Sequence, residues 1–149
     1  MSQLSFPLPE FYLPVRVYIE DTDAGSIVYY VNYLKFMERA RTEFLRDLGF
    51  EHYLHSDEDF MFVVRGAQVR YFSPARMDDA LVVTAQIKSL GRASLVFHQK
   101  VQRDDVVLVG GDIDIACVRR SDMKPRALPE RLVALLKSRY APASGNLAS

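Results

Sequence analysis

Two carboxylates lie one residue apart in the sequence DTD at positions 21–23, and the small residues AGS follow at 24–26. This composition lets the backbone turn sharply. A helical pattern begins near Val31, so the acids stand just before a helix N-terminus, where unpaired N–H groups carry roughly half an elementary positive charge. Such groups can polarise a carbonyl, while a neighbouring carboxylate attacks it or activates a water molecule. The chemistry this favours is acyl transfer to water.

The alternative is that Asp21 and Asp23 serve only the turn. Short polar residues that precede a helix are ordinarily turn and capping residues. Spacing alone favours that structural role. Both side chains can point to the same side of an extended segment, so proximity does not choose between them.

A longer motif with fixed spacings crosses the same region: Arg16, Val17, Thr22, Asp23, Ile27, Val28, Tyr30 and Tyr33. It resembles the active-site signature of the 4-hydroxybenzoyl-CoA thioesterase family, which are small acyl-CoA hydrolases. The blocks EDTDAG, FMERARTEFLR, FSPARMDD, SLVF and MKPRALP resemble the bacterial branch associated with the Tol-Pal envelope system. Agreement over several blocks between Pro14 and Leu132 is more specific than one short motif.

The resemblance implies a hotdog fold of class α+β, in which a five-stranded antiparallel sheet wraps around one long central helix. It implies that Asp23 is the catalytic carboxylate, as nucleophile or general base, and that the backbone amide of Tyr30 is the oxyanion donor. No metal or other cofactor is implied. Ser26 stands where the family usually has Gly or Ala, and Tyr30 where the branch commonly has His, which affects the expected substrate range more than the reaction.

The implied substrate is the thioester of an aliphatic or small aromatic acyl-CoA. We expect its acyl pocket near Tyr29, Tyr30 and Phe62. The candidates for binding the phosphates of coenzyme A are basic residues near Gly91 and near the C-terminus, with ordinary surface charge as the alternative for each: Lys88, Arg92, Lys124 and Arg126.

Two other function classes remain open. A hotdog dehydratase typically combines a His with a carboxylate, and the lack of a His in the turn or on the helix counts against it. A scaffold that binds acyl carrier protein or envelope-synthesis enzymes is the alternative to catalysis, although intact Asp23 favours an enzyme. Glu38 is either a second catalytic acid or, as we prefer, the ion-pair partner of Arg41 or Arg16.

Composition predicts one domain over residues 1–149, with an extended N-terminal segment at 1–13 and a flexible tail at 141–149. The 149 residues are 49% hydrophobic with formal net charge +0, which does not favour nucleic acid or an anionic membrane as the main partner. Cys117 is the one cysteine, so an intrachain disulfide is excluded, and it is expected to be a buried strand residue. The proline-containing N-terminus lacks a basic signal region, and no apolar run approaches ~20 residues, so a cytoplasmic protein without membrane insertion is expected.

Hydrophobic periodicity predicts the elements that position the acids. A strand at 15–20 leads into the turn, and a helix at 31–48 follows, with Gly49 placed to end it. Further strands are expected at 60–71, 80–90, 94–103 and 106–119, and a short helix at 130–138.

The sequence also allows predictions for the three histidines and for one pair of adjacent glycines. His52 and His55, in the polar connection 51–59, are expected to be exposed rather than metal ligands. His98 is expected to be an ordinary strand residue, because no partner acid is evident. Gly110-Gly111 predicts a bulge or a close backbone approach.

A lone five-stranded sheet leaves exposed edges, so a homo-oligomer built as a dimer of dimers is expected. In the hotdog family that dimer also completes the active site, with the helix start of one subunit facing the strands of the other.

Overall fold

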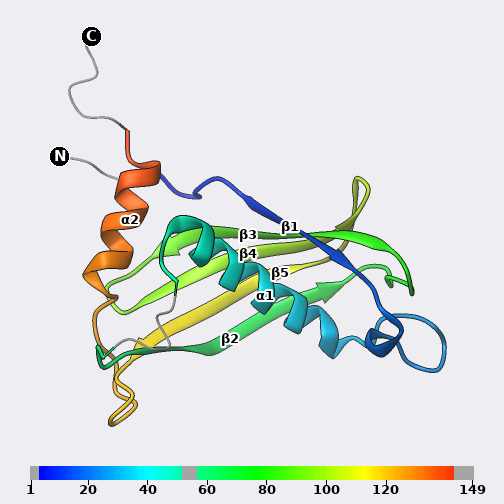
Figure 1. Cartoon of the computed structure of the whole chain (residues 1–149), viewed down its shortest axis with the longest axis horizontal. Coiled ribbons are helices and arrows are strands. Elements are labelled where there is room, and N and C mark those ends of the chain that lie inside the picture. The colour runs from blue at the N-terminus through cyan, green and yellow to red at the C-terminus, as the bar shows by residue number, and fades with distance from the viewer. Residues whose placement is uncertain (1–3, 52–56, 143–149) are drawn as a thin grey trace.

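A computed structural model describes residues 4–51 and 57–142 and contains one antiparallel sheet with the strand order β1-β3-β4-β5-β2. A long helix, α1, crosses one face of the sheet, and a shorter helix, α2, lies at one end (Figure 1). The elements are β1 Phe11–Arg16, α1 Val31–Leu48, β2 Met61–Tyr71, β3 Ala80–Leu90, β4 Ser94–Arg103, β5 Val106–Val118 and α2 Glu130–Tyr140. This is the predicted arrangement of a sheet around one central helix. His52 and His55 lie outside the described residues.

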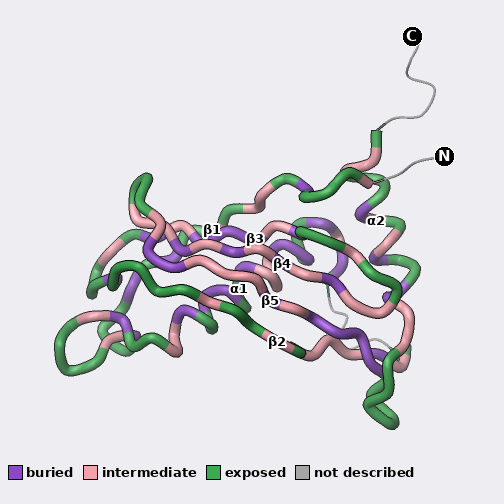
Figure 2. The backbone as a smooth tube through the Cα atoms, turned by 180° about the vertical axis from the view of Figure 1, so that it is seen from behind, coloured by how far each residue is buried: buried purple, intermediate pink, exposed green. Residues whose placement is uncertain are grey.

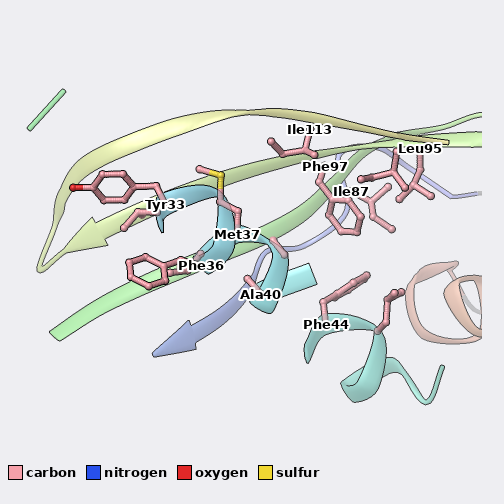
Figure 3. Packing of buried hydrophobic residues seen from close by; sticks show 14 of the residues in the cluster. Tyr33, Phe36, Met37, Ala40, Phe44, Ile87, Leu95, Phe97 and Ile113 are labelled. Carbon is pink, nitrogen blue, oxygen red and sulfur yellow. The ribbon is translucent and has the colours of Figure 1, made fainter. Parts of the chain in front are cut away.

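Helix α1 has the predicted bounds and buries the predicted face. Its apolar residues recur three and four positions apart and point at the sheet (Figure 3). The buried residues of α1 are Tyr33, Phe36, Met37, Ala40, Phe44, Leu45 and Leu48. The helix ends at Gly49, which adopts a left-handed conformation with φ of 100° and donates its N–H to the Arg46 carbonyl.

The sheet presents an apolar inner face to α1. Ile87, Leu95, Phe97 and Ile113 come from the three central strands and pack on the helix (Figure 3). Each is at most 4% exposed, so this contact forms the core of the chain.

Strand β1 lies four residues earlier than predicted. It spans Phe11–Arg16, while Ile19–Asp21 forms a 3-10 turn in place of the end of the predicted strand. Pro14 lies inside this strand and is tolerated because β1 pairs only with β3 and is an edge strand.

The other bounds differ little from the predictions. Strand β2 begins one residue late, β5 ends one residue early, and α2 continues to Tyr140. Gly111 makes the predicted close approach, because a Cβ atom there would collide with the Gln68 carbonyl oxygen. Cys117 is buried, as predicted.

Strand β2 forms the second edge of the sheet and is largely accessible along its length (Figure 2). Val64 in this strand is 55% exposed. Among the described residues, no helix combines the length and the apolar character needed to cross a membrane.

Candidate active site

The turn that carries Asp23 is closed by its own backbone. The Asp23 N–H donates to the Ile27 carbonyl at 3.0 Å, and the Ser26 N–H donates to the Asp23 carbonyl at 3.0 Å. Ser26 has φ of 64°, in the left-handed region that residues other than glycine seldom adopt. The Gly25 N–H donates to Asp23 Oδ1 at 2.8 Å, and the Asp23 side chain is exposed. The turn therefore holds one carboxylate oxygen and leaves the other facing solvent.

The start of α1 lies directly after this turn. The Tyr29 N–H donates to the Asp21 carbonyl at 3.0 Å, and the Asn32 N–H donates to the Tyr29 carbonyl at 2.8 Å. Within residues 4–51 and 57–142, the Tyr30 N–H between them has no backbone acceptor. Tyr30 is the N-cap residue, so this N–H belongs to the positive end of the helix. It is chemically suited to bind an oxyanion.

The two aspartates differ in their surroundings. Asp21 is 9% exposed, and its Oδ2 accepts the Tyr18 N–H at 2.9 Å. Its carbonyl also accepts the side-chain N–H of Asn32 at 2.8 Å. Asp21 therefore joins the turn to the helix, while Asp23 alone presents a carboxylate to solvent.

A loop at 72–79, between β2 and β3, backs the acid turn. The Val28 N–H donates to the Ala75 carbonyl at 2.9 Å, and the Met77 N–H donates to the Ser26 carbonyl at 3.1 Å. The buried Ala75 N–H donates to the hydroxyl of Tyr33 at 2.8 Å. Sequence analysis missed this support, although the block FSPARMDD was part of the resemblance.

Asp79 fixes the far end of that loop. Its Oδ2 accepts the Arg76 N–H at 2.8 Å and pairs with Arg103 Nη1 at 2.8 Å. Burial acts to raise the pKa of Asp79, but the Arg76 N–H and the Arg103 guanidinium outweigh it and hold the pKa below its ordinary value. The loop is therefore anchored by an ionised carboxylate.

Aromatic rings surround the helix start. The ring centroids of Tyr29 and Tyr30 are 5.1 Å apart, and those of Tyr30 and Tyr71 are 6.0 Å apart. Tyr33 lies 5.8 Å from Tyr71 on the buried side. Tyr29, Tyr30 and Tyr71 are 48%, 58% and 45% exposed, so they form an accessible apolar wall beside the acid. Tyr71 was not predicted from the sequence.

Phe62 lines a different space. It borders a cavity of about 110 Å³ between the C-terminal half of α1 and the sheet, walled by Leu45, Phe97 and Ile115, with Leu132 of α2 at its end. The fourteen steps from Val31 to Leu45 span roughly 21 Å of helix. Within one chain, the Leu45 end of the cavity therefore lies far from Asp23. Phe62 lines this cavity and Tyr29 does not, so the two do not share a pocket.

A buried polar network reaches the rim of this cavity. Gln99 is 0% exposed, and its side-chain amide donates to the Met37 carbonyl at 2.9 Å and to the Thr84 carbonyl at 3.0 Å. Its Oε1 accepts from Arg41 Nη1 at 2.9 Å. Glu38 and Arg41 both line the cavity.

The predicted ion pairs of Glu38 are not formed. Among the described side chains, no salt bridge joins Glu38 to Arg41 or to Arg16. Gln99 binds Arg41 instead, and Arg16 donates to the Asp78 carbonyl at 2.7 Å. The prediction failed because both arginines find partners that are distant in the sequence.

The candidate phosphate-binding cations differ in their surroundings. Lys88 Nζ pairs with Asp112 at 2.6 Å, and Arg126 Nη2 pairs with Glu58 at 2.9 Å, so acids already compensate both charges. Arg92 and Lys124 are exposed, and neither forms an ion pair with a described side chain.

Position also separates Arg92 from the acid turn. The Leu128 N–H donates to the Arg92 carbonyl at 2.9 Å, which places Arg92 beside the segment that leads into α2. In Figure 1, α2 and the acid turn lie at opposite ends of α1.

His98 has an acid partner that the sequence did not indicate. Its Nδ1 lies 2.8 Å from Asp112 Oδ1, because His98 and Asp112 are directly opposite on β4 and β5. Within the described ranges, no group of three or more His, Cys, Asp and Glu side chains could hold a metal ion.

Comparison with known proteins is consistent with this geometry. The sequence profile of the Thioesterase superfamily matches residues 25–109. The chain is 46% identical over 128 residues to the acyl-CoA thioester hydrolase YbgC of Escherichia coli O6:H1, covering 85% of this chain and 96% of that protein. It is 41% identical over 125 residues to the acyl-CoA thioesterase YbgC of Haemophilus influenzae, covering 83% and 92%.

A solved structure agrees in fold. The probable thioesterase of Bartonella henselae superposes with a TM-score of 0.77 at 35% identity, covering 81% of this chain and all of that one (100%). The hotdog fold and the family that the sequence resembled are confirmed. The chain belongs to the Thioesterase superfamily.

Proposed function

We propose that this protein hydrolyses acyl-CoA thioesters with Asp23 as the catalytic carboxylate and the Tyr30 N–H as the oxyanion donor. The observation that carries the proposal is the combination of an exposed carboxylate, on a turn closed by backbone hydrogen bonds, with an N–H at the helix start that has no backbone acceptor. The relatives named as acyl-CoA thioester hydrolases support the same reaction class.

In the reaction, the thioester carbonyl oxygen accepts a hydrogen bond from the Tyr30 N–H. In one route, Asp23 removes a proton from water as the water oxygen bonds to the carbonyl carbon, and the carbon–sulfur bond then breaks. In the other route, Asp23 itself bonds to that carbon, the carbon–sulfur bond breaks to leave a mixed anhydride, and water then cleaves the anhydride to free the acid and Asp23. In both routes the sulfur leaves as the thiolate of coenzyme A and takes up a proton. The positive end of α1 stabilises the negative charge that develops on the carbonyl oxygen.

The acyl group we expect is short and aliphatic, or a small aromatic ring. The cavity bordered by Phe62 holds about 110 Å³ and is partly open, somewhat less than the roughly 150 Å³ of an enclosed cavity that takes up benzene, so it favours a short chain or one small ring over a long chain. Beside Asp23, further apolar surface comes from the rings of Tyr29, Tyr30 and Tyr71.

Pairing with a second copy of the chain would bring the cavity of one copy close to the Asp23 turn of the other. β2 is an open edge, and two β2 strands that pair antiparallel place the Met61 end of one copy beside the Tyr71 end of the other. The Phe62 cavity of one subunit then lies near the Tyr71 wall and the acid of its partner. We therefore propose a homodimer, assembled further into a tetramer, as the active form.

For coenzyme A, Arg92 is the strongest of the predicted phosphate-binding residues. It is exposed and has no acidic partner among the described residues, whereas Lys88 is held by Asp112. On the dimer described above, Arg92 lies at the cavity end that faces the partner's acid. Affinity for coenzyme A should fall as salt rises.

The test is a hydrolysis panel with acetyl, butyryl, hexanoyl, palmitoyl and benzoyl thioesters of coenzyme A, followed by release of free thiol. Turnover highest for butyryl, hexanoyl or benzoyl groups is the expected result. Folded protein that hydrolyses none of them refutes the proposed reaction.

Assembly is tested with Val64→Lys, which places a charge on the open edge and, because Val64 also borders the cavity, is judged first by sedimentation. Sedimentation should show dissociation together with loss of activity. A fully active monomer would rule out the shared site.

A further inference from the structure

One buried hydroxyl joins the two parts of the proposed site. Tyr33 stands in the first turn of α1, is 3% exposed, and accepts the N–H of Ala75 at 2.8 Å across 42 residues of sequence. Ala75 is 0% exposed, so no water can replace the hydroxyl as its acceptor. Figure 3 shows the Tyr33 ring beyond the end of the apolar row on α1, with its hydroxyl pointing away from the helix.

The same residue, Ala75, supports the acid turn. The Ala75 carbonyl accepts the Val28 N–H at 2.9 Å, and Ile27 pairs with Arg76 as an isolated antiparallel bridge. Ile27 in turn accepts the Asp23 N–H. Hydrogen bonds thus run from the helix, through Ala75, to the segment that closes the Asp23 turn.

Tyr33 also belongs to the turn that presents the oxyanion donor. Its N–H donates to the Tyr30 carbonyl at 3.3 Å, so the backbone of Tyr33 is bonded to the residue that carries the proposed oxyanion donor. Rings at 5.8 Å (Tyr71) and 6.3 Å (Phe36) hold the Tyr33 ring from two sides. Burial raises the pKa of Tyr33, which keeps the hydroxyl neutral across the working pH range.

We propose that Tyr33 is a positioning residue: its hydroxyl, through Ala75, sets the position of the Asp23 carboxylate relative to the Tyr30 N–H. This inference rests on the proposed function of those two groups. A displacement of about 1 Å between reacting groups can lower turnover by about a hundredfold. Loss of the hydroxyl should therefore lower kcat while leaving substrate binding nearly unchanged.

The first test is Tyr33→Phe, which keeps the ring and removes the hydroxyl. We expect kcat to fall about tenfold or more, with KM within about threefold of the wild-type value. The matched control is Tyr12→Phe on β1, which removes a hydroxyl that donates to Glu10, away from the site, and should leave kcat unchanged. A kcat of Tyr33→Phe within about threefold of wild type overturns the proposal, as does a change confined to KM.

The second test separates positioning from mere stability. If Tyr33 acts through Asp23, the kcat loss caused by Tyr33→Phe should largely disappear when both proteins already carry Asp23→Asn. The same loss in both backgrounds overturns the proposal. Normal turnover of Asp23→Asn overturns both this inference and the proposed function, whereas a slow Asp23→Asn with a normal Tyr33→Phe overturns this inference alone.

A third variant covers the case in which Tyr33→Phe folds poorly. The double variant Tyr33→Phe/Ala75→Pro removes both the Tyr33 hydroxyl and the Ala75 N–H that it accepts, so no buried N–H is left without an acceptor. The proline ring takes space that the hydroxyl leaves. We expect thermal stability to recover relative to Tyr33→Phe while kcat remains low. Recovery of kcat to the wild-type value would show that the hydroxyl only satisfies a buried amide, and would overturn the proposal.

Discussion

Replacing Asp23 by Asn removes a charge with little change to the turn. The Gly25 N–H that now donates to Oδ1 at 2.8 Å can donate to the amide oxygen of Asn, and the backbone bonds to Ile27 and Ser26 do not involve the side chain. The free energy of unfolding should therefore change by no more than about 0.5 kcal/mol, as for other exposed substitutions.

The effect on catalysis should be much larger. An amide neither removes a proton from water nor acts as a nucleophile, so we expect turnover to fall about a hundredfold or more, which corresponds to about 2.7 kcal/mol of transition-state stabilisation. The assay is steady-state release of coenzyme A from the best substrate of the panel. Thermal unfolding of the same sample shows that the protein is folded.

Two controls make this result specific. Asp21→Asn should have less effect on turnover and more on stability, by about 1 kcal/mol, because the buried Asp21 carboxylate accepts the Tyr18 N–H. Glu38→Gln removes the other candidate acid without touching the turn, and its turnover should stay within about threefold of wild type. Near-normal turnover of Asp23→Asn would mean that the acid, or the reaction, has been assigned wrongly.

Three further predictions concern the thiol, the cavity and the loop. Cys117 is buried and burial raises the pKa of its thiol, so the folded protein should not react with a thiol reagent at pH 8, whereas the denatured protein should react fully. Leu95→Phe should fill part of the cavity and lower kcat/KM for hexanoyl-CoA and benzoyl-CoA more than for acetyl-CoA in the hydrolysis panel. Because the pKa of Asp79 is lowered in the folded protein, its contribution to stability is present above the ordinary value of about 3.9 and is lost as pH falls through the folded pKa. Urea unfolding at a series of pH values between about 5 and 2 should therefore show a shallower loss of stability for Asp79→Asn than for wild type.

The elements of the fold were predictable because each carries a local signal. The apolar spacing of α1 and the glycine that ends it are contained within nineteen consecutive residues, and strand β4 alternates between buried and half-buried positions over most of its length. Strand β1 was misplaced for an equally local reason. Pro14 marks a boundary in most strands, and only the position of β1 at the sheet edge makes a proline acceptable there.

The candidate site also has features that the local sequence predicts and features that depend on the fold. The sequence places Asp23 and Tyr30 together because they are seven positions apart and a turn joins them. It does not indicate which aspartate is buried, because that depends on the contact between Asp21 and Tyr18 and on the packing of the helix start. The burial of Asp21 is the structural reason for favouring Asp23 as the catalytic acid.

Contacts between distant residues explain the remaining failures. Gln99 occupies an inward position of β4 where its neighbours are Leu95, Phe97 and Val101, and this break in the apolar series was the one available sign of a buried polar network. Its partner Arg41 lies 58 residues away, which is why the nearer Glu38 was taken as the partner. Buried polar groups must be satisfied, so a polar residue in an apolar strand face predicts that a partner exists without identifying it.

The same reasoning applies to Tyr33. Its helical spacing predicts burial, and burial of a tyrosine predicts an acceptor or donor for its hydroxyl. Only the fold shows that the partner is the Ala75 amide, on the loop that supports the acid turn. The proposed catalytic groups thus lie in one short segment, and the contact proposed to set their relative position joins residues 42 positions apart.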